Sequence, residues 1–272
     1  MKAPVVQVVL RVGRMHLRRG PRGSAPPDAW PGGRVRCLPM SGVPADLEPT
    51  RRAAWDRFAR RDALFHADPN TGDEAEFLAA GRRNVARVME WLGEDAARGR
   101  MLEIGCGPAR TAEAFAAFFE RVDGVDVSPE MLRRARARPL PPNLVLTATS
   151  GADLEPFDDG AFDFVFSHLV FQHIDEEAVV ASYLREVARV LAPEGLALLQ
   201  FDTRPPSRLA AALSALPDPL LPRSRRRHMR RHRRDPARLR TLARAAGLEP
   251  VRERGGAGPE HWFFLRRCRP AA

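Results

Sequence analysis

The sequence predicts an α/β fold built on a doubly wound sheet of seven strands, the last of them antiparallel. After residue 99, short apolar runs alternate with stretches of helical periodicity, which is the pattern of successive strand–helix units. A glycine-rich turn joins the first of these strands to the helix that follows it. The chain has 272 residues, of which 44% are apolar, and this is enough to bury one sizeable core.

Seven segments are expected to form strands, because they are short, apolar and bounded by turn residues. In chain order they are Met101–Ile104, Val122–Asp126, Asn143–Thr147, Phe162–Ser167, Leu196–Phe201, Glu249–Glu253 and His261–Arg267. A Gly-Gly-Ala-Gly-Pro turn separates the last two, which predicts a hairpin. We therefore expect six parallel strands and one antiparallel strand.

Helices are expected before and between the strands. Thr50, Asp175 and Asp235 each stand before a helical pattern and are candidate N-caps. Gly81 lies on the apolar stripe of the second helix, where a small side chain lets another element approach closely. The predicted helices are about Thr50–Asp62, Asp73–Leu92, Thr111–Glu120, Pro129–Arg136, Glu176–Leu191 and one from Pro236 to a stop at Gly247.

The composition divides the chain into three regions. Residues 1–45 are rich in Pro, Gly and Arg and show no sustained periodicity, so we expect a disordered extension that the folded part does not need. Residues 46–97 are expected to form an N-terminal helical segment, and residues 98–272 the main α/β domain. Within that domain, residues 203–234 form a variable, arginine-rich connection between the fifth strand and the last helix.

The formal net charge is +10, but both terminal regions are basic and residues 46–202 are acidic. Lys2 is the only lysine, so nearly all basic residues are arginines, a skew typical of a GC-rich genome and weak evidence for nucleic-acid binding. No apolar run reaches the roughly 18 residues that a membrane span requires. We therefore expect a cytoplasmic protein that does not enter a membrane.

The segment Met101–Arg110 carries the most chemical information, because a strand runs there into a glycine-rich turn and then a helix. Gly105 and Gly107 allow the backbone to turn sharply and to approach a ligand without Cβ clashes. Asp126 ends the second strand, nineteen residues after Gly107. A carboxylate at that distance can accept hydrogen bonds from both hydroxyls of a ribose. The pattern therefore predicts a nucleoside-cofactor site.

Two residues distinguish between cofactors. A dinucleotide site has a third glycine where this chain has Arg110. It also has no use for an acid two residues before the first glycine, where this chain has Glu103. A carboxylate at Glu103 suits the ammonium group of a methionine-derived ligand. Both differences favour S-adenosylmethionine over NAD.

The stretch LEIGCGPARTAEAFAAFFERVDGVDVSPEMLRRARAR resembles the first two motifs of the class I S-adenosylmethionine-dependent methyltransferases. FDFVFSHLVFQHI is similar to that family's fourth-strand motif, and LREVARVLAPEGLALLQF to its fifth-strand region. The resemblance covers roughly residues 98–202, and residues 50–92 are similar to the leading helices of bacterial small-molecule members. It implies a Rossmann-like fold, with S-adenosylmethionine as cofactor.

The resemblance also implies roles for individual residues. Glu103, Gly105 and Gly107 would hold the methionine end of the cofactor, and Asp126 the ribose hydroxyls. The family commonly has an acid after its third strand that accepts the adenine amino group, and here that position is Ser150, followed by Gly151. The family's usual glycine at position 109 is alanine. The residues expected against the adenine are Val127 and Met131.

Two histidines, His168 and His173, flank the loop after the fourth strand, at the rim where substrates of open α/β sheets bind. Imidazole is suited to accept a proton, so His173 is a candidate general base and His168 a second candidate. The alternative, a hydrogen bond that fixes the loop, is favoured because a lone histidine is more often structural. No cluster with metal-ligand spacing is present, so we expect no metal site.

The run Arg223–Arg234 could bind the phosphates of a nucleic acid. It lacks interleaved aromatic residues for stacking. The fourth strand leads into Ser167-His168-Leu169-Val170, not into the Asn-Pro-Pro-Tyr type turn of amino-directed nucleic-acid methyltransferases. A solvated connection that also screens the substrate cleft is therefore the favoured interpretation.

We predict methyl transfer from S-adenosylmethionine to an O, N or C nucleophile of a small molecule, with alignment of the reactants as the main source of catalysis. Two alternatives stay open at this point. One is an RNA methyltransferase or RNA-binding protein that uses the arginine run. The other is a cofactor-binding protein that has lost catalysis, which the departures at Ala109 and Ser150 suggest.

Overall fold

The computed structural model describes residues 48–67, 73–93, 97–205 and 230–268, and the extension predicted over residues 1–45 lies outside them. Within the described residues, one sheet contains seven strands in the order β3-β2-β1-β4-β5-β7-β6. The strands are β1 (Arg100–Ile104), β2 (Arg121–Asp126), β3 (Leu144–Ala148), β4 (Phe162–Ser167), β5 (Leu191–Phe201), β6 (Leu248–Arg254) and β7 (His261–Arg267).

The strand directions confirm the predicted doubly wound sheet with an antiparallel last strand. β1 pairs in parallel with β2 and β4, β2 with β3, and β4 with β5. β7 runs antiparallel to both of its neighbours, β5 and β6. The chain proceeds from β1 to β3 on one side and then returns to β4 on the other. This reversal creates a switch point at the carboxyl ends of β1 and β4, where open α/β sheets bind ligands.

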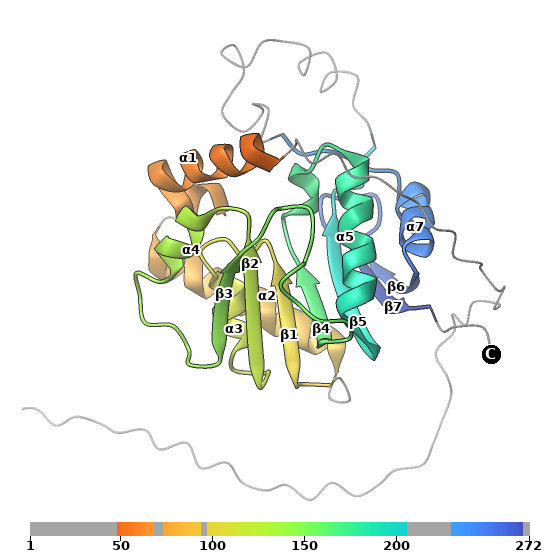
Figure 1. The fold of residues 1–272 in the computed structure, drawn as a ribbon, viewed down its shortest axis with the longest axis horizontal. Helices are drawn as coiled ribbons and strands as arrows, with labels where there is room; N and C mark the ends of the chain where they lie inside the picture. The colour runs from red at the N-terminus through yellow and green to blue at the C-terminus, as the bar shows by residue number, and fades with distance from the viewer. Residues whose placement is uncertain (1–47, 68–72, 94–96, 206–229, 269–272) are drawn as a thin grey trace, which may run out of the picture. The chain divides into compact units, whose positions relative to one another are not determined.

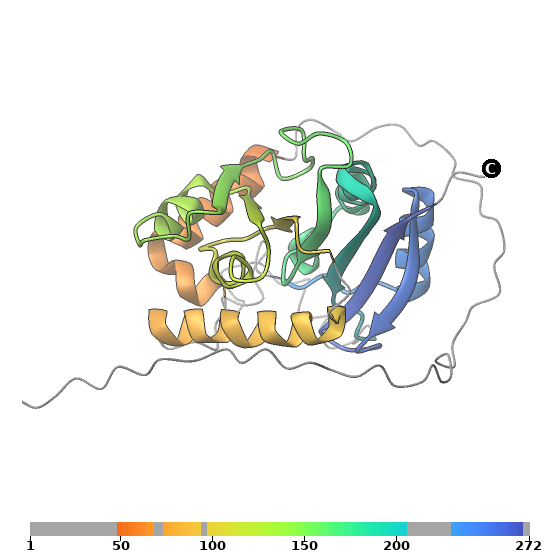
Figure 2. The same cartoon turned by 90° about the horizontal axis from the view of Figure 1, so that it is seen from below.

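Helices cover both faces of the sheet (Figures 1 and 2). Residues of α2, α3 and α4 pack on one face in one apolar cluster, and residues of α5 and α7 pack on the other face in a second cluster. The helices are α1 (Glu48–Ala67), α2 (Glu74–Leu92), α3 (Arg110–Phe115), α4 (Pro129–Ala135), the 3-10 turn η1 (Phe171–His173), α5 (Glu177–Val190) and α7 (Pro236–Ala245).

Two of the predicted helix caps are wrong. α1 begins at Glu48, so Thr50 lies inside the helix instead of before it. α5 is preceded by Glu176, which makes no side-chain capping bond. The carboxylate of Asp175 lies 3.6 Å from the guanidinium of Arg51 in α1. A tertiary ion pair has therefore taken the side chain that was expected to cap α5.

The third helix is shorter than its pattern predicts. α3 ends at Phe115, whereas the apolar periodicity continues to Glu120. The side-chain amide of Asn143 donates hydrogen bonds to the carbonyl oxygens of Ala116 and Phe119, each at 3.0 Å. These long-range bonds hold the chain in a turn that leads into β2.

In the last part of the fold, the start of β5 differs from its prediction, whereas the cap of α7 and the final hairpin are confirmed. β5 begins at Leu191, five residues before the predicted start, because Leu191 pairs with Phe162 ahead of an irregularity in the β4–β5 ladder. Asp235 is confirmed as an N-cap, since its side chain accepts a hydrogen bond from the Ala237 N–H at 3.1 Å. The predicted hairpin is confirmed by the antiparallel pairing of β6 and β7.

α1 lies across the end of the sheet and is fixed there by α4 (Figure 1). The carboxylate of Asp56 accepts hydrogen bonds from the Ser128 hydroxyl at 2.5 Å and from the Glu130 N–H at 3.2 Å. The Ser128 oxygen accepts in turn from the Met131 N–H and so caps α4. Since the first turn of a helix offers unpaired donors, a carboxylate from α1 is a stabilising partner there.

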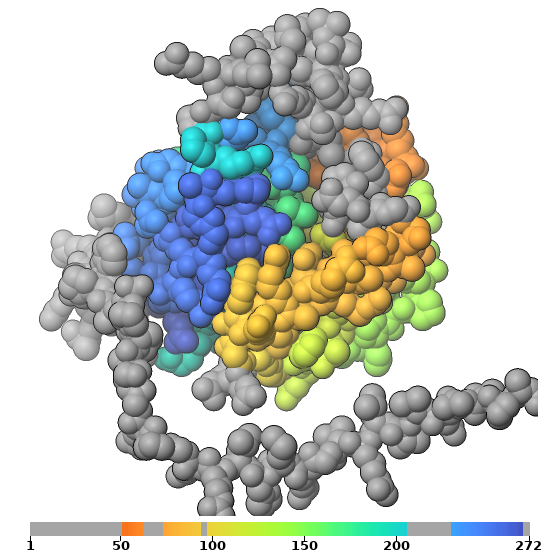
Figure 3. Space-filling view, turned by 180° about the vertical axis from the view of Figure 1, so that it is seen from behind, coloured from red at the N-terminus to blue at the C-terminus, as the bar shows by residue number. Residues whose placement is uncertain are grey.

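Gly81 permits the close approach of α2 and α3, as its place on the apolar stripe predicts. A Cβ at this position would lie 2.4 Å from the backbone oxygen of Arg110, the first residue of α3. The same face of α2 buries Phe77, Val85 and Val88. The opposite side of α2 forms part of the molecular surface, next to the β6–β7 pair (Figure 3). The glycine thus sets how deeply α2 sits on the domain.

We expect Gly81→Ala to lower the free energy of unfolding by about 1–3 kcal/mol, because the added methyl group overlaps backbone atoms that cannot rotate away. In an unhindered helix the same change would raise it by up to about 1 kcal/mol. Urea unfolding measures the difference. The control is Gly256→Ala, where an added Cβ meets no atom within 4 Å. A more stable Gly81→Ala protein would contradict this packing.

Candidate functional site

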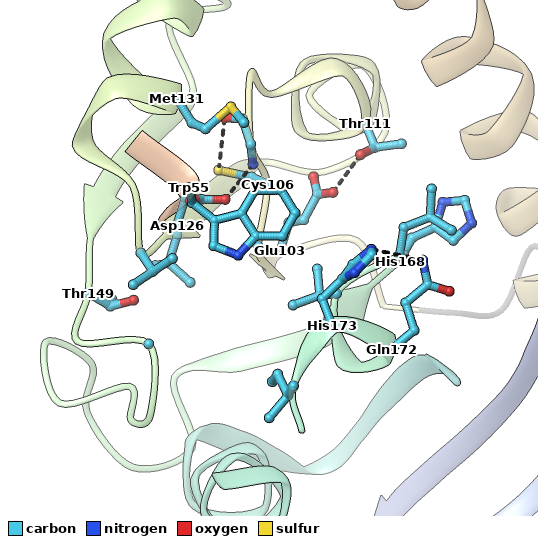
Figure 4. A pocket seen from close by; sticks show the side chains of 18 of the residues that line it. Trp55, Glu103, Cys106, Thr111, Asp126, Met131, Thr149, His168, Gln172 and His173 are labelled. Carbon is cyan, nitrogen blue, oxygen red and sulfur yellow. Dashed lines mark hydrogen bonds between the residues drawn. The ribbon is translucent and has the colours of Figure 1, made fainter. Parts of the chain in front are cut away.

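The candidate site is a cavity at the carboxyl ends of β1, β2 and β4, with side chains of α1 in its lining. It lies at the switch point of the sheet. Figure 4 shows that Glu103, Asp126 and His173 all face this region. Nine of the ten predicted site residues line the cavity, and Ser150 does not. The nine are Glu103, Gly105, Gly107, Asp126, Val127, Met131, Gly151, His168 and His173.

The glycine-rich turn after β1 has the backbone conformation that its sequence predicts. Gly105 has a φ of +70° and Gly107 a φ of +53°, both in the left-handed region that favours glycine. A Cβ on Gly105 would lie 2.3 Å from a methyl carbon of Val170, so a side chain does not fit there. Ala109 has a φ of +64° and therefore keeps the turn with alanine in place of glycine.

Asp126, the last residue of β2, is fixed in the cavity by two backbone donors. One carboxylate oxygen accepts a hydrogen bond from the Gly107 N–H and the other from the Ser128 N–H, each at 2.8 Å. Burial raises the pKa of Asp126 to about 6, although these two hydrogen bonds act in the opposite direction. Each oxygen keeps a further lone pair, so the group can accept hydrogen bonds from two neighbouring hydroxyls.

Glu103 of β1 is a buried carboxylate, with 2% of its surface exposed. Its Oε1 accepts a hydrogen bond from the hydroxyl of Thr111 in α3. Its Oε2 is buried without a hydrogen-bond partner among the described residues. Burial raises the pKa of Glu103 to about 8. Because buried acceptors rarely lack a donor, this oxygen points to a ligand group, and an ammonium fits its charge.

The side of the cavity next to α4 is apolar. Val127 and Met131 line it, and Met131 packs in a small cluster with Ala59 and Trp55 of α1. Trp55 itself also lines the cavity. Apolar side chains suit the face of an adenine ring, and the adenine contacts expected of Val127 and Met131 stay predictions.

Ser150 occupies a turn beside the cavity and does not line it. Its hydroxyl donates a hydrogen bond to Asp153 at 2.6 Å and accepts one from the Ala152 N–H at 3.1 Å. Its neighbours Thr149 and Gly151 line the cavity instead. The adenine contact expected at Ser150 stays a prediction, and the structure adds Thr149 as a residue with direct access.

His173 lies in η1 and is half-buried, and its ring meets that of Trp55 edge-on at 5.5 Å between centroids. Its Nε2 lies 3.2 Å from the amide nitrogen of the neighbouring Gln172. Its Nδ1 has no hydrogen-bond partner in the described part of the chain. Burial, and then the nearby charge of Arg231, lowers the pKa of His173 to about 4. The imidazole is therefore neutral at physiological pH, the form in which a base accepts a proton.

His168 is packed into the wall of the cavity near the β6–β7 pair. Its ring lies 4.9 Å from that of Trp262, and its Nε2 lies 3.7 Å from Glu260. Arg87 of α2 reaches the same carboxylate at 3.3 Å. The contact with His168 lowers the pKa of Glu260 to about 2, while burial lowers the pKa of His168. His168 thus packs against Trp262 in the wall, and the roles expected of His168 and His173 as bases stay predictions.

Thr111, Trp55 and Arg231 are among the residues that line the cavity and were not among the predicted site residues. Thr111 follows the glycine-rich turn directly, so the motif itself holds the signal that would have found it. Trp55 and Arg231 come from segments far from the motif, before β1 and after β5. Nothing in their local sequence distinguishes them from other apolar or basic residues. Only the packing of α1 and of the segment before α7 brings them to the cavity.

Comparisons with known proteins agree with this geometry. A family profile described as a methyltransferase domain matches residues 102–199. The ubiquinone biosynthesis O-methyltransferase of Xanthomonas oryzae pv. oryzae is 29% identical over 121 residues, which are 44% of this chain and 49% of that protein. The Bordetella avium protein of the same name is 28% identical over 209 residues, 75% of this chain and 83% of that one. The chain thus spans about half the length of the Xanthomonas relative.

Solved structures show the same fold. Magnesium protoporphyrin IX methyltransferase from Synechocystis PCC 6803, solved with bound SAH, matches with a TM-score of 0.55 and 18% identity over 79% of this chain and 97% of that one. The CcbJ methyltransferase from Streptomyces caelestis matches with a TM-score of 0.51 and 21% identity over 70% and 90%. The predicted Rossmann-like architecture is confirmed.

Proposed function

We propose that this chain, which belongs to the class I S-adenosylmethionine-dependent methyltransferase family, transfers a methyl group from S-adenosylmethionine to a hydroxyl oxygen of a small molecule. One observation carries the proposal: a single cavity holds a buried and a half-buried carboxylate, suited to the two ends of that cofactor. Glu103 offers an unpartnered oxygen, and Asp126 is fixed by two backbone donors. The names of the Xanthomonas and Bordetella relatives support oxygen as the acceptor atom.

The side chains of the cavity fit S-adenosylmethionine from end to end. Glu103 would accept hydrogen bonds from the ammonium group, and Asp126 would accept them from the ribose hydroxyls. The adenine would lie against Val127 and Met131, which line the apolar side. A dinucleotide fits less well, because Arg110 stands where its third glycine is needed and is itself almost fully buried.

When bound, S-adenosylmethionine supplies a methyl carbon that an acceptor oxygen attacks as the sulfur–carbon bond breaks. The cavity aligns the acceptor, and Trp55 of α1 helps to exclude water from it. His173 would take the hydroxyl proton. The Gln172 side chain presents its amide nitrogen to Nε2 at 3.2 Å. If the amide is turned so that its oxygen faces Nε2, the imidazole keeps its proton on Nε2 and offers the Nδ1 lone pair to the hydroxyl proton.

The other functions considered from the sequence are not favoured. The described end of the arginine run, residues 230–234, contacts η1 and the end of β5 and places Arg231 in the cavity lining. The inactive-protein alternative depends on Ala109 and Ser150. Ala109 keeps the left-handed turn, and Ser150 lies outside the lining, so neither residue obstructs the cavity.

S-adenosylhomocysteine is expected to bind with release of a proton at pH 7. In the free protein the pKa of Glu103 is about 8, so its carboxyl group is mostly protonated at that pH. Beside an ammonium group it is ionised, and its proton must leave. The affinity should therefore fall by up to about tenfold for each pH unit below 8. Calorimetric titrations in buffers of different ionisation enthalpy count the released protons.

Glu103→Gln keeps the shape of the side chain and removes its titration, so it should abolish this proton release. Exposed Glu155→Gln is the matched control. Asp126→Ala should weaken binding by about 1.5–3 kcal/mol through loss of charge-assisted hydrogen bonds. Proton release that persists in Glu103→Gln would contradict the ammonium assignment, and binding of NAD instead of S-adenosylhomocysteine would overturn the cofactor proposal.

Methyl transfer itself is measured with S-adenosylmethionine labelled in the methyl group and a panel of phenols, catechols and aliphatic alcohols. His173→Gln should lower kcat by about 10²-fold with little change in KM. This is the low end of the loss expected on removal of a general base, because an imidazole with a pKa of about 4 is a weak base. His168→Gln should leave kcat within about threefold of wild type. Label that enters structured RNA and no small molecule would overturn the proposal.

A further inference from the structure

The end of the arginine run is docked at the rim of the cavity. The His232 N–H donates a hydrogen bond to the Gln172 carbonyl oxygen at 2.6 Å, and the Arg234 N–H donates one to the Asp202 carbonyl oxygen at 2.9 Å. These bonds fix the backbone just after Arg231, whose side chain lines the cavity. The position of Arg231 is therefore set by η1 and by the residue that follows β5.

Arg231 differs from the arginines beside it in what its guanidinium contacts. Arg233 donates to the carbonyl oxygen of Pro205, and Arg234 donates to that of Ile174, each at 2.6 Å. Among the residues that the structure describes, no acceptor hydrogen-bonds the guanidinium of Arg231, and no carboxylate lies within 4 Å of it. Its charge is thus available to a ligand in the cavity.

The charges around the cavity are divided between its two ends. The lining carboxylates, Glu103 and Asp126, belong to the cofactor end. At the other end, Arg51 is neutralised by two carboxylates of the loop before α5. Arg231 supplies an uncompensated positive charge there, and its field reaches His173, whose pKa it lowers. The Arg231 side chain is exposed and borders the cavity, so its guanidinium can bind an anion that enters from the rim.

We infer that the small-molecule acceptor carries an anionic group, a carboxylate or a phosphate, which binds Arg231 at the rim while its hydroxyl reaches His173. The inference rests on the proposed function and specifies its substrate class. A guanidinium holds either anion through two parallel N–H donors, which would orient the acceptor as well as attract it. Leu169, Val170 and Ile174 also line the cavity, so the remainder of the acceptor is apolar.

The test uses the full chain with S-adenosylhomocysteine bound and two matched pairs of probes. 4-Hydroxybenzoate is compared with 4-hydroxybenzamide, and phenyl phosphate with phenol. Wild type should bind at least one of the anions about tenfold or more tightly than its neutral partner, as measured by calorimetry, because a charge-assisted pair replaces a neutral contact. The pair with the larger ratio identifies the anion as carboxylate or phosphate.

Arg231→Gln should abolish this preference and leave the affinity for S-adenosylhomocysteine unchanged within about twofold. Arg231→Lys should keep part of it. Arg238→Gln, which removes an exposed arginine of α7, is the control for charge and should keep all of it. Three outcomes would overturn this inference but not the proposed function. They are equal affinities of wild type for the anionic and neutral probes, a preference for the anion that survives in Arg231→Gln, and no binding of any probe. Failure of S-adenosylhomocysteine to bind wild type would overturn the proposed function, and with it this inference.

Discussion

The carboxylate of Asp126 joins the two strand ends from which the site is built. It accepts hydrogen bonds from Gly107, in the turn after β1, and from Ser128, at the start of α4. Ser128 is in turn bound by Asp56, which ties α1 to the same place. The turn, the second strand and the covering helix are therefore held by one chain of polar contacts. The same carboxylate is the group assigned to the ribose, so the bond that organises the site is also part of it.

Much of the fold could be predicted because its signals are local. Strands such as Phe162–Ser167 are buried on both faces, so their sequences are nearly continuous apolar runs with clear ends. The glycine-rich turn needs left-handed backbone at Gly105 and Gly107, which few other residues supply. The number of residues between that turn and Asp126 is fixed because one helix and one strand lie between them. For these features a short window of sequence contains the cause of the structure.

The features that could not be predicted depend on partners far away in the chain. Asp175 does not cap α5, because Arg51 of α1 lies beside it. α3 stops early, because Asn143 takes the carbonyl oxygens that follow its end. Trp55 and Arg231 reach the cavity only through tertiary packing. The acceptor half of the site is therefore built mainly from long-range contacts, whereas the cofactor half follows from one local motif.

The central claim is that Glu103 and Asp126 hold the two polar ends of one S-adenosylmethionine-type ligand. A crystal structure of the chain with S-adenosylhomocysteine tests it most directly. The account predicts the ligand's amino group within hydrogen-bond distance of Glu103 Oε2, the oxygen that has no partner among the described residues. It also predicts both ribose hydroxyls on the carboxylate of Asp126. A ligand bound in the reverse orientation, or outside this cavity, would contradict the account.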